Sequence, residues 1–255
     1  MIRPWLRFFR VVNLPTVPGD VLVGSASCFA AISLAGLSLG DDVAALVRSA
    51  LCAAAASLFV YLFGLADNDL VGARADSTAR PIPAGEISPA AARLARALCL
   101  GGALATGLLA HLPRMWSFAA FALLVAIVLY NRTKSSLLMG LCRALNVVCG
   151  VFALPLACGW MLSAPFKALG CLAAAPVVWL AYVFFLTRCS VGEEHDEAKR
   201  QFVGFLIGAL VYLQLVALVV FALIEPKTNR FLVVGAVLLV VLRVMRRLLP
   251  KVSPS

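Results

Sequence analysis

Long apolar runs constrain this chain more than any other feature of its sequence. Each run is continuous and about 20 residues long, which is the length that an α-helix needs to cross the hydrocarbon core of a bilayer. The predicted spans are 17–39, 44–66, 90–111, 115–130, 139–160, 168–187, 202–224 and 231–249. A transmembrane β-barrel would instead alternate apolar and polar residues in short segments. The sequence therefore predicts an all-α, polytopic bundle of transmembrane helices.

The composition excludes the common soluble classes. Of the 255 residues, 63% are hydrophobic and 13% are charged, whereas a soluble domain is about half apolar and a quarter charged. The eight cysteines contain no Cys-x-x-Cys pair and most lie within apolar runs, so we expect neither a metal cluster nor a disulfide framework. Since no linker or low-complexity segment interrupts the spans, residues 1–255 are expected to form a single integral-membrane domain.

The basic residues predict an orientation in the membrane. The net charge is +10, and 17 of the 22 Lys and Arg residues fall on the cytoplasmic side if the N-terminus is placed there. Cytoplasmic segments carry such an excess of Lys and Arg. We therefore expect cytoplasmic N- and C-termini and an even number of spans. No basic run with interleaved aromatics stands clear of the spans, so the lipid bilayer is an expected partner and nucleic acid is not.

Polar residues are concentrated in two segments of the cytoplasmic side, 67–89 and 188–201. If the second span continues as a helix, Asn68 and Asp69 share a helix face with Asp76, because the spacings are eight and seven residues. Carboxylates gathered in this way suit Mg²⁺, with further oxygens from a diphosphate. A solvated interfacial loop is the alternative, since loops are the default place for charges in membrane proteins.

The same stretch resembles the first aspartate-rich motif of the UbiA family of intramembrane prenyltransferases. Asn68, Asp69 and Asp76 occupy the first, second and last positions of its pattern, Asn-Asp-x-x-Asp-x-x-x-Asp. Gly72 stands at the middle aspartate. The family's following loop is matched by Arg80, Pro81, Ile82, Gly85, Ile87 and Ser88. The residues between Asp76 and Arg80 are fewer than in the family pattern.

Two shorter motifs support the resemblance. Arg10 followed by Asn13 in a polar-Leu-Pro-Thr turn is similar to the family's opening motif, for which a helix start with an interfacial Arg is the alternative. Tyr130 and Lys134 resemble a Tyr-x-x-x-Lys element, for which a positive-inside anchor is the alternative.

The fifth span and the second acidic segment supply further candidates. Arg143 and Asn146 are polar residues three apart in an apolar helical run, so we expect them to line an inner cavity. Glu193 and Glu197 take the place of the family's second aspartate motif, by position and charge. His195 between them is a candidate base, with an ordinary loop histidine as the alternative.

The resemblance, which covers about residues 10–201, implies a function. It implies eight to nine helices and Mg²⁺-dependent transfer of an isoprenyl group from a polyprenyl diphosphate to an aromatic or lipid acceptor. The implied Mg²⁺ ligands are Asp69, Asp76, Glu193 and Glu197. The implied catalytic cations, which would neutralise the departing pyrophosphate, are Arg80, Lys134 and Arg143. The implied substrate-binding residues are Asn68, Asn146, Tyr130 and Asn13.

Other functions remain open at the level of sequence. A non-catalytic lipid-binding or scaffold relative would explain Gly72 and the altered second motif. A small-molecule transporter would have charged or broken helices at mid-membrane, whereas the acidic residues here lie at one end. A CDP-alcohol phosphotransferase is excluded by the spacing around Gly72. The acceptor, the prenyl chain length and the oligomeric state are not predicted. Short loops favour the inner membrane of a bacterium, with a cytoplasmic active face.

Overall fold

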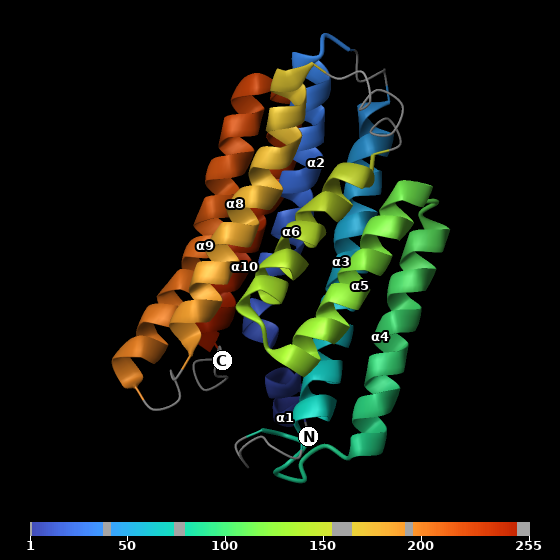
Figure 1. The fold of residues 1–255 in the computed structure, drawn as a ribbon. Helices are drawn as coiled ribbons and strands as arrows, with labels where there is room; N and C mark the ends of the chain where they lie inside the picture. The colour runs from blue at the N-terminus through green and yellow to red at the C-terminus, as the bar shows by residue number, and fades with distance from the viewer. Residues whose placement is uncertain (1, 38–41, 74–79, 155–164, 192–195, 249–255) are drawn as a thin grey trace.

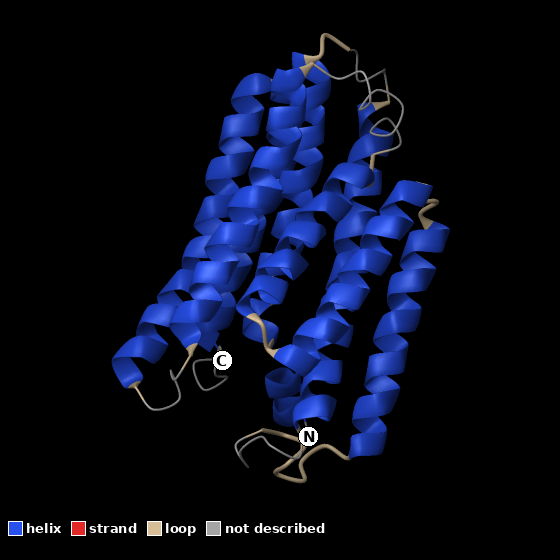
Figure 2. Cartoon of the chain, viewed as in Figure 1, coloured by secondary structure: helices blue, strands red, loops and turns tan. Residues whose placement is uncertain are grey.

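The computed structural model describes residues 2–37, 42–73, 80–154, 165–191 and 196–248, which are helical apart from turns and short loops (Figures 1 and 2). Within these described ranges, seven helices are long and apolar enough to cross a membrane. They are α2 (Thr16–Leu34), α3 (Val43–Gly72), α4 (Pro89–Leu109), α5 (Arg114–Thr133), α8 (Phe166–Ser190), α9 (Glu197–Ile224) and α10 (Asn229–Leu248). The helix α6 (Ser136–Phe152) is apolar but shorter. The predicted all-α membrane bundle is therefore confirmed.

Each of the eight predicted spans coincides with one of these helices, and two differences matter for the site. Helix α3 continues to Gly72, beyond the predicted end at 66, so Asn68 and Asp69 are helical. The predicted face that they share with Asp76 lies partly outside the described residues. Helix α6 ends at Phe152, and most of the remainder of the predicted span 139–160 lies outside the described residues.

Helix α2 is the centre of the bundle. Every residue from Thr16 to Ile32 is buried, and the helix packs against α3, α6, α8, α9 and α10. In Figure 1, α3, α4 and α5 lie on one side of it, and α8, α9 and α10 lie on the other. Since α6 contacts α2, α5 and α8, it joins the two groups of helices.

Glycines allow α2 and α6 to approach closely. A Cβ atom on Gly24 would lie 1.9 Å from the carbonyl oxygen of Val147, and one on Gly150 would lie 2.0 Å from that of Val21. The Ser25 hydroxyl donates to the Gly150 carbonyl at 2.8 Å. Membrane helices commonly associate through such small residues, because lipid provides no hydrophobic drive for packing between helices.

The first helix, α1 (Ile2–Phe8), packs on the loop between α3 and α4. Phe8 is fully buried in a cluster with Ile82 and Ile87, and Arg7 forms an ion pair with Glu86. This loop turns at Gly85, whose φ is +73°. The loop then leads into α4. Ser88 is the N-cap of this helix, since its hydroxyl accepts from the Ala91 backbone amide at 3.2 Å, and Pro89 is the first helical residue. Serine at the N-cap and proline at the first helical position are both favoured at the start of a helix.

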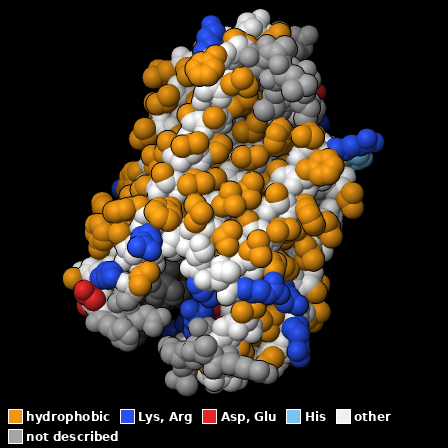
Figure 3. All heavy atoms as spheres, in the orientation of Figure 1, with side chains coloured by type: hydrophobic (Ala, Val, Ile, Leu, Met, Phe, Trp, Pro, Cys, Tyr) orange, Lys and Arg blue, Asp and Glu red, His pale blue; other side chains and the backbone are white. Residues whose placement is uncertain are grey.

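The surface divides into an apolar body and polar ends. Figure 3 shows hydrophobic side chains over most of the visible face, while Lys and Arg side chains gather at its lower end. The starts of α4, α6 and α9 and the ends of α3, α5, α8 and α10 lie at that end (Figure 1). The two polar segments that the sequence singled out therefore meet the same end of the bundle.

Candidate functional site

A cavity of about 130 Å³ lies between α2, α3, α5 and α6. Its apolar wall includes Val17, Val60, Leu65, Leu123, Ile127 and Met139. Its polar lining consists of Arg10, Ser57, Tyr61, Asn68, Tyr130, Asn131, Arg143 and Asn146. For comparison, an engineered apolar cavity of about 150 Å³ binds benzene. The cavity therefore has room for a small apolar group with polar side chains around it.

Cationic side chains converge on the last turns of α3, at one end of this cavity. Asp69 is 4% exposed, and its Oδ1 atom lies 3.2 Å from Arg80 Nη1 and 3.6 Å from Arg10 Nη2. The adjacent side chain, Asn68, accepts a hydrogen bond from Lys134 Nζ. We call these five residues the mouth of the cavity. Three of these five side chains are cations and one is a carboxylate, a set that favours an anion.

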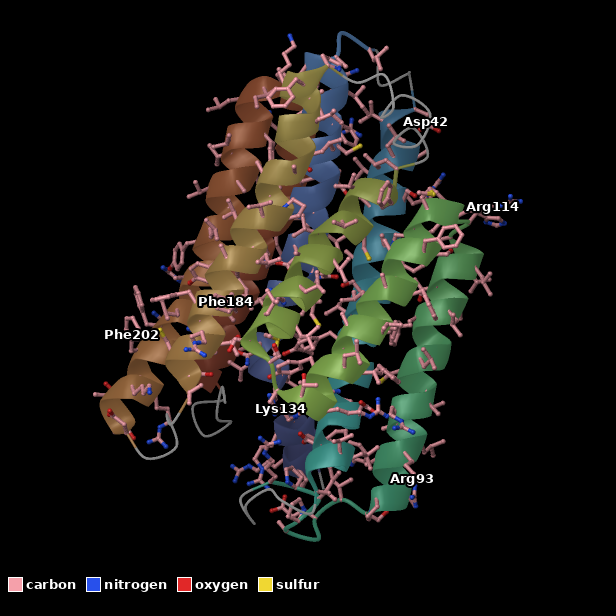
Figure 4. All side chains as sticks on the ribbon, in the orientation of Figure 1. Asp42, Arg93, Arg114, Lys134, Phe184 and Phe202 are labelled. Atoms are coloured by element: carbon pink, nitrogen blue, oxygen red, sulfur yellow. The ribbon has the colours of Figure 1, made fainter. Side chains whose placement is uncertain are left out.

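Two of the mouth cations are held by unusual backbone conformations. Arg10 has φ 41° and Lys134 has φ 54°, both in the left-handed region that non-glycine residues rarely occupy. Lys134 ends α5, where its amide donates to the Tyr130 carbonyl at 2.7 Å. Its Nζ atom lies 5.6 Å from the centre of the Tyr130 ring, a cation–π contact. The predicted Tyr-x-x-x-Lys element thus places its lysine at the mouth (Figure 4).

Asn13 belongs to the turn that carries Arg10. It ends the 3-10 helix η1 (Val11–Asn13) and is 8% exposed. The backbone N–H of Asn13 donates to the Arg10 carbonyl at 2.8 Å, and the backbone carbonyl of Asn13 accepts from the Thr16 hydroxyl at 2.8 Å. This short turn directs Arg10 towards Asp69 while α2 begins at Thr16.

Arg143 and Asn146 line the cavity, as expected from polar residues in an apolar helix. Their partner is Asp20 of α2, which sequence reasoning missed. Arg143 Nε lies 2.9 Å from Asp20 Oδ2, and Asn146 Nδ2 donates to the same oxygen at 3.1 Å. Asp20 also accepts from Trp179 and Gln214. The sequence did contain a signal for this cluster: Asp20 and Gln214 both lie within predicted spans, where polar side chains are rare.

Asp67 is turned away from the mouth. It accepts from Arg96 at 2.9 Å and from Asn131 at 2.9 Å. One residue along a helix rotates the side chain by about 100°, so Asp67 faces α4 and α5 rather than sharing the direction of Asn68. Asp67 therefore links helices instead of replacing the missing middle aspartate.

The predicted Mg²⁺ ligands are only partly described. Asp76 and Glu193, like His195, lie outside the described residues. Glu197 is exposed at the start of α9, where it pairs with Arg200 of the same helix. Among the residues that the structure describes, no group of three or more His, Cys, Asp or Glu side chains could hold a metal ion. The described part of the mouth thus contributes one carboxylate, Asp69, to the expected site.

Comparison with known proteins identifies the fold. No protein-family model and no curated protein sequence matches the chain. A solved structure of digeranylgeranylglyceryl phosphate synthase superposes with a TM-score of 0.50 at 14% identity, covering 99% of this chain and 97% of that one. A UbiA homologue from Archaeoglobus fulgidus bound to GPP and Mg²⁺ gives a TM-score of 0.47 at 16% identity, covering 93% and 86%. The chain shares the fold of digeranylgeranylglyceryl phosphate synthase, and this helical membrane fold agrees with the one that the resemblance of its motifs implies.

Proposed function

We propose that the protein transfers an isoprenyl group from a polyprenyl diphosphate to an aromatic or lipid acceptor within the membrane, in an Mg²⁺-dependent reaction. One observation carries this proposal: an apolar cavity inside a membrane bundle has a cationic mouth at its end. A diphosphate with a hydrocarbon tail is a ligand whose two parts match these two environments. A fully polar anion would lack a hydrocarbon part that could pack against the apolar wall.

The diphosphate binds at the mouth in this proposal. Arg10, Arg80 and Lys134 donate charge-assisted hydrogen bonds to its oxygens, which are about twice as strong as neutral ones. Mg²⁺ would be held by Asp69 with Asp76, and by Glu193 or Glu197 across the mouth, and it would supply further charge for the leaving pyrophosphate. The oxygen ligands suit this hard cation.

The prenyl group occupies the cavity, next to Val60, Leu123 and Ile127. The bond between the allylic carbon and the bridging oxygen breaks, and its electron pair leaves with the pyrophosphate. The acceptor then forms a bond to the allylic cation and loses a proton. Preorganised cations at the mouth stabilise the charge that develops on the pyrophosphate.

The remaining substrate-binding residues take positions along this path. We assign Asn68 to the diphosphate, because it lies beside Asp69 and Lys134. Tyr130 and Asn146 line the cavity where the prenyl group would lie, and Asn13 supports the turn that carries Arg10. We further propose that this mouth faces the cytoplasm, in the inner membrane of a bacterium.

A binding experiment tests the proposal without knowledge of the acceptor. The protein is purified in detergent, and binding of a labelled polyprenyl diphosphate is measured with Mg²⁺ and with a chelator. Asp69→Asn is compared with Asp42→Asn. Asp42 is exposed at the opposite end of the bundle (Figure 4) and caps α3, a role that Asn fills equally well.

The outcomes separate the proposed function from its rivals. We expect binding that requires Mg²⁺ and Asp69 and that Asp42→Asn leaves unchanged. If folded protein binds the donor equally well with chelator and after Asp69→Asn, a non-catalytic lipid binder that has lost its metal site would be favoured. No binding at all, with flux of a small molecule in proteoliposomes, would favour the transporter.

A further inference from the structure

A fully buried carboxylate lies behind the cavity wall. Asp20, on the second turn of α2, has no exposed surface. Trp179 Nε1 and Gln214 Nε2 donate to its Oδ1 atom at 2.6 and 2.7 Å. Arg143 and Asn146 hold its Oδ2 atom from α6. The four partners come from α6, α8 and α9, so one carboxylate connects four helices.

The packing around Asp20 is shaped to admit these partners. A Cβ atom on Gly19 would lie 2.1 Å from Gln214 Oε1, so only glycine leaves room for this amide. Both Gln214 and Arg143 also donate to the Thr16 carbonyl, at 2.7 and 2.9 Å. Arg143 of α6 and Gln214 of α9 therefore both donate to the Thr16 carbonyl and to the Asp20 carboxylate of α2.

Stability alone does not explain a charge pair at this depth. Replacing a buried ion pair by apolar residues is often neutral or stabilising, whereas removing one partner is strongly destabilising. Ionisable side chains inside membrane helices are expensive and commonly functional. The pair between Asp20 and Arg143 therefore points to a role in the neighbouring site.

The network meets the cavity through Arg143 and Asn146. Both side chains line it, whereas Asp20 stands behind them. The Asn146 amide is held from both sides, because its oxygen accepts from the Ser57 hydroxyl and its nitrogen donates to Asp20 and to the Val17 carbonyl. Asp20 can thus act on a bound molecule only by orienting or neutralising these side chains.

Arg143 differs from the mouth cations in its carboxylate partner. At the mouth, Arg10 and Arg80 lie against Asp69, and Lys134 donates to Asn68. In the cavity wall, Arg143 is paired with the Asp20 carboxylate. An unbalanced guanidinium there would repel an allylic cation, and this repulsion is strong in a low-dielectric interior.

We infer that Asp20 is a positioning residue for the transfer reaction, an inference that rests on the proposed function. It neutralises Arg143 and fixes the direction of its guanidinium, so that Arg143 offers N–H donors to the leaving oxygen without opposing the cation. Asp20 itself touches neither the donor nor the acceptor.

The test measures ionisation of the donor in the absence of an acceptor. The probe is geranyl diphosphate with an isotopically labelled bridging oxygen, supplied with Mg²⁺ to detergent-purified protein. Reversible cleavage of the carbon–oxygen bond exchanges the bridging oxygen with the others of the same phosphate, and this exchange is followed by mass spectrometry or NMR. Donor affinity and thermal unfolding are measured for Asp20→Asn, Arg143→Gln and the double variant.

We expect Asp20→Asn to slow the exchange on the order of 100-fold while donor affinity changes less than about threefold. The double variant has no charge at either position, and we expect it to recover roughly tenfold of the exchange. This recovery also covers the case in which Asp20→Asn alone does not fold, because the double variant leaves no buried charge unpaired.

Two results would overturn the inference. One is exchange in Asp20→Asn at the wild-type rate. The other is a double variant that regains thermal stability without regaining exchange relative to the single variant, which would mean that Asp20 only joins helices. Wild-type protein that neither binds the donor nor exchanges the label would overturn the proposed function itself, together with the inference.

Discussion

At the scale of single residues, the site is built from charges that neighbouring helices bring together. Arg10 precedes α2, Arg80 follows α3 and Lys134 ends α5, and all three reach the pair formed by Asn68 and Asp69. None of the three is an isolated surface charge, because each is directed towards a buried polar partner. This convergence distinguishes them from the other basic residues at the same end of the bundle.

The mouth cations can be tested against a surface arginine. We expect Lys134→Ala and Arg80→Ala each to weaken polyprenyl diphosphate binding by roughly 10- to 100-fold, since hydrogen bonds to charged groups contribute about 1.5–3 kcal/mol. Arg93→Ala is the control, because Arg93 is exposed on α4 at the same end (Figure 4). Equal loss in the control would show that general surface charge attracts the donor, contrary to our account.

Sequence reasoning found two of the five residues in the network around Asp20. Arg143 and Asn146 stood out because polar side chains three apart in an apolar helix are expected to line an inner cavity. Their shared partner, Asp20, lies more than 120 residues earlier in the chain, and no local pattern connects it with them. Spacing along one helix predicts which side chains share a face, but only the packing of α2 against α6, α8 and α9 shows what they face.

At the scale of elements, the cavity depends on where α2 and α6 cross. Gly24 and Gly150 place the two backbones in contact deeper in the bundle than Asp20 and Arg143. The same closeness lets Arg143 reach both the Thr16 carbonyl and Asp20. The length of α3 was predicted less well, because its last turn is polar and the apolar run ends at Ala66.

The crossing can be tested with a matched pair of glycine variants. In Gly24→Ala, the new methyl group meets the Val147 carbonyl, so we expect a loss of about 1–3 kcal/mol in stability. Gly101→Ala on α4 has open space around the new atom and should be neutral or stabilising by up to about 1 kcal/mol. Thermal unfolding in detergent measures both, and equal stability of the two variants would contradict the close crossing.

At the scale of the whole molecule, the polar site lies at the end of the bundle where α1 begins and α10 ends (Figure 1). Each apolar run of the sequence coincides with a described helix, and the common end of α1 and α10 agrees with an even number of runs. The order of helices around α2 could not be predicted, since it depends on contacts between segments distant in sequence. Which side of the membrane the mouth faces remains a prediction from the positive-inside pattern.

Labelling of single cysteines tests this orientation. In a background without the native cysteines, Arg93→Cys marks the mouth end and Lys227→Cys marks the loop between α9 and α10 at the opposite end. Both native side chains are exposed. We expect a membrane-impermeant thiol reagent to label Lys227→Cys in intact cells and Arg93→Cys only after the membrane is opened. The reverse pattern would place the mouth outside the cytoplasm.

The central claim is that a prenyl diphosphate binds with its diphosphate at the mouth and its prenyl group in the cavity. The most direct measurement is cross-linking with a photoreactive prenyl diphosphate, with the labelled residues mapped by mass spectrometry. We expect adducts at cavity residues such as Val60, Leu123 and Ile127, and we expect them to require Mg²⁺ and to be suppressed by unlabelled donor. Adducts confined to lipid-facing side chains such as Phe118 and Phe121, unaffected by competing donor, would contradict it.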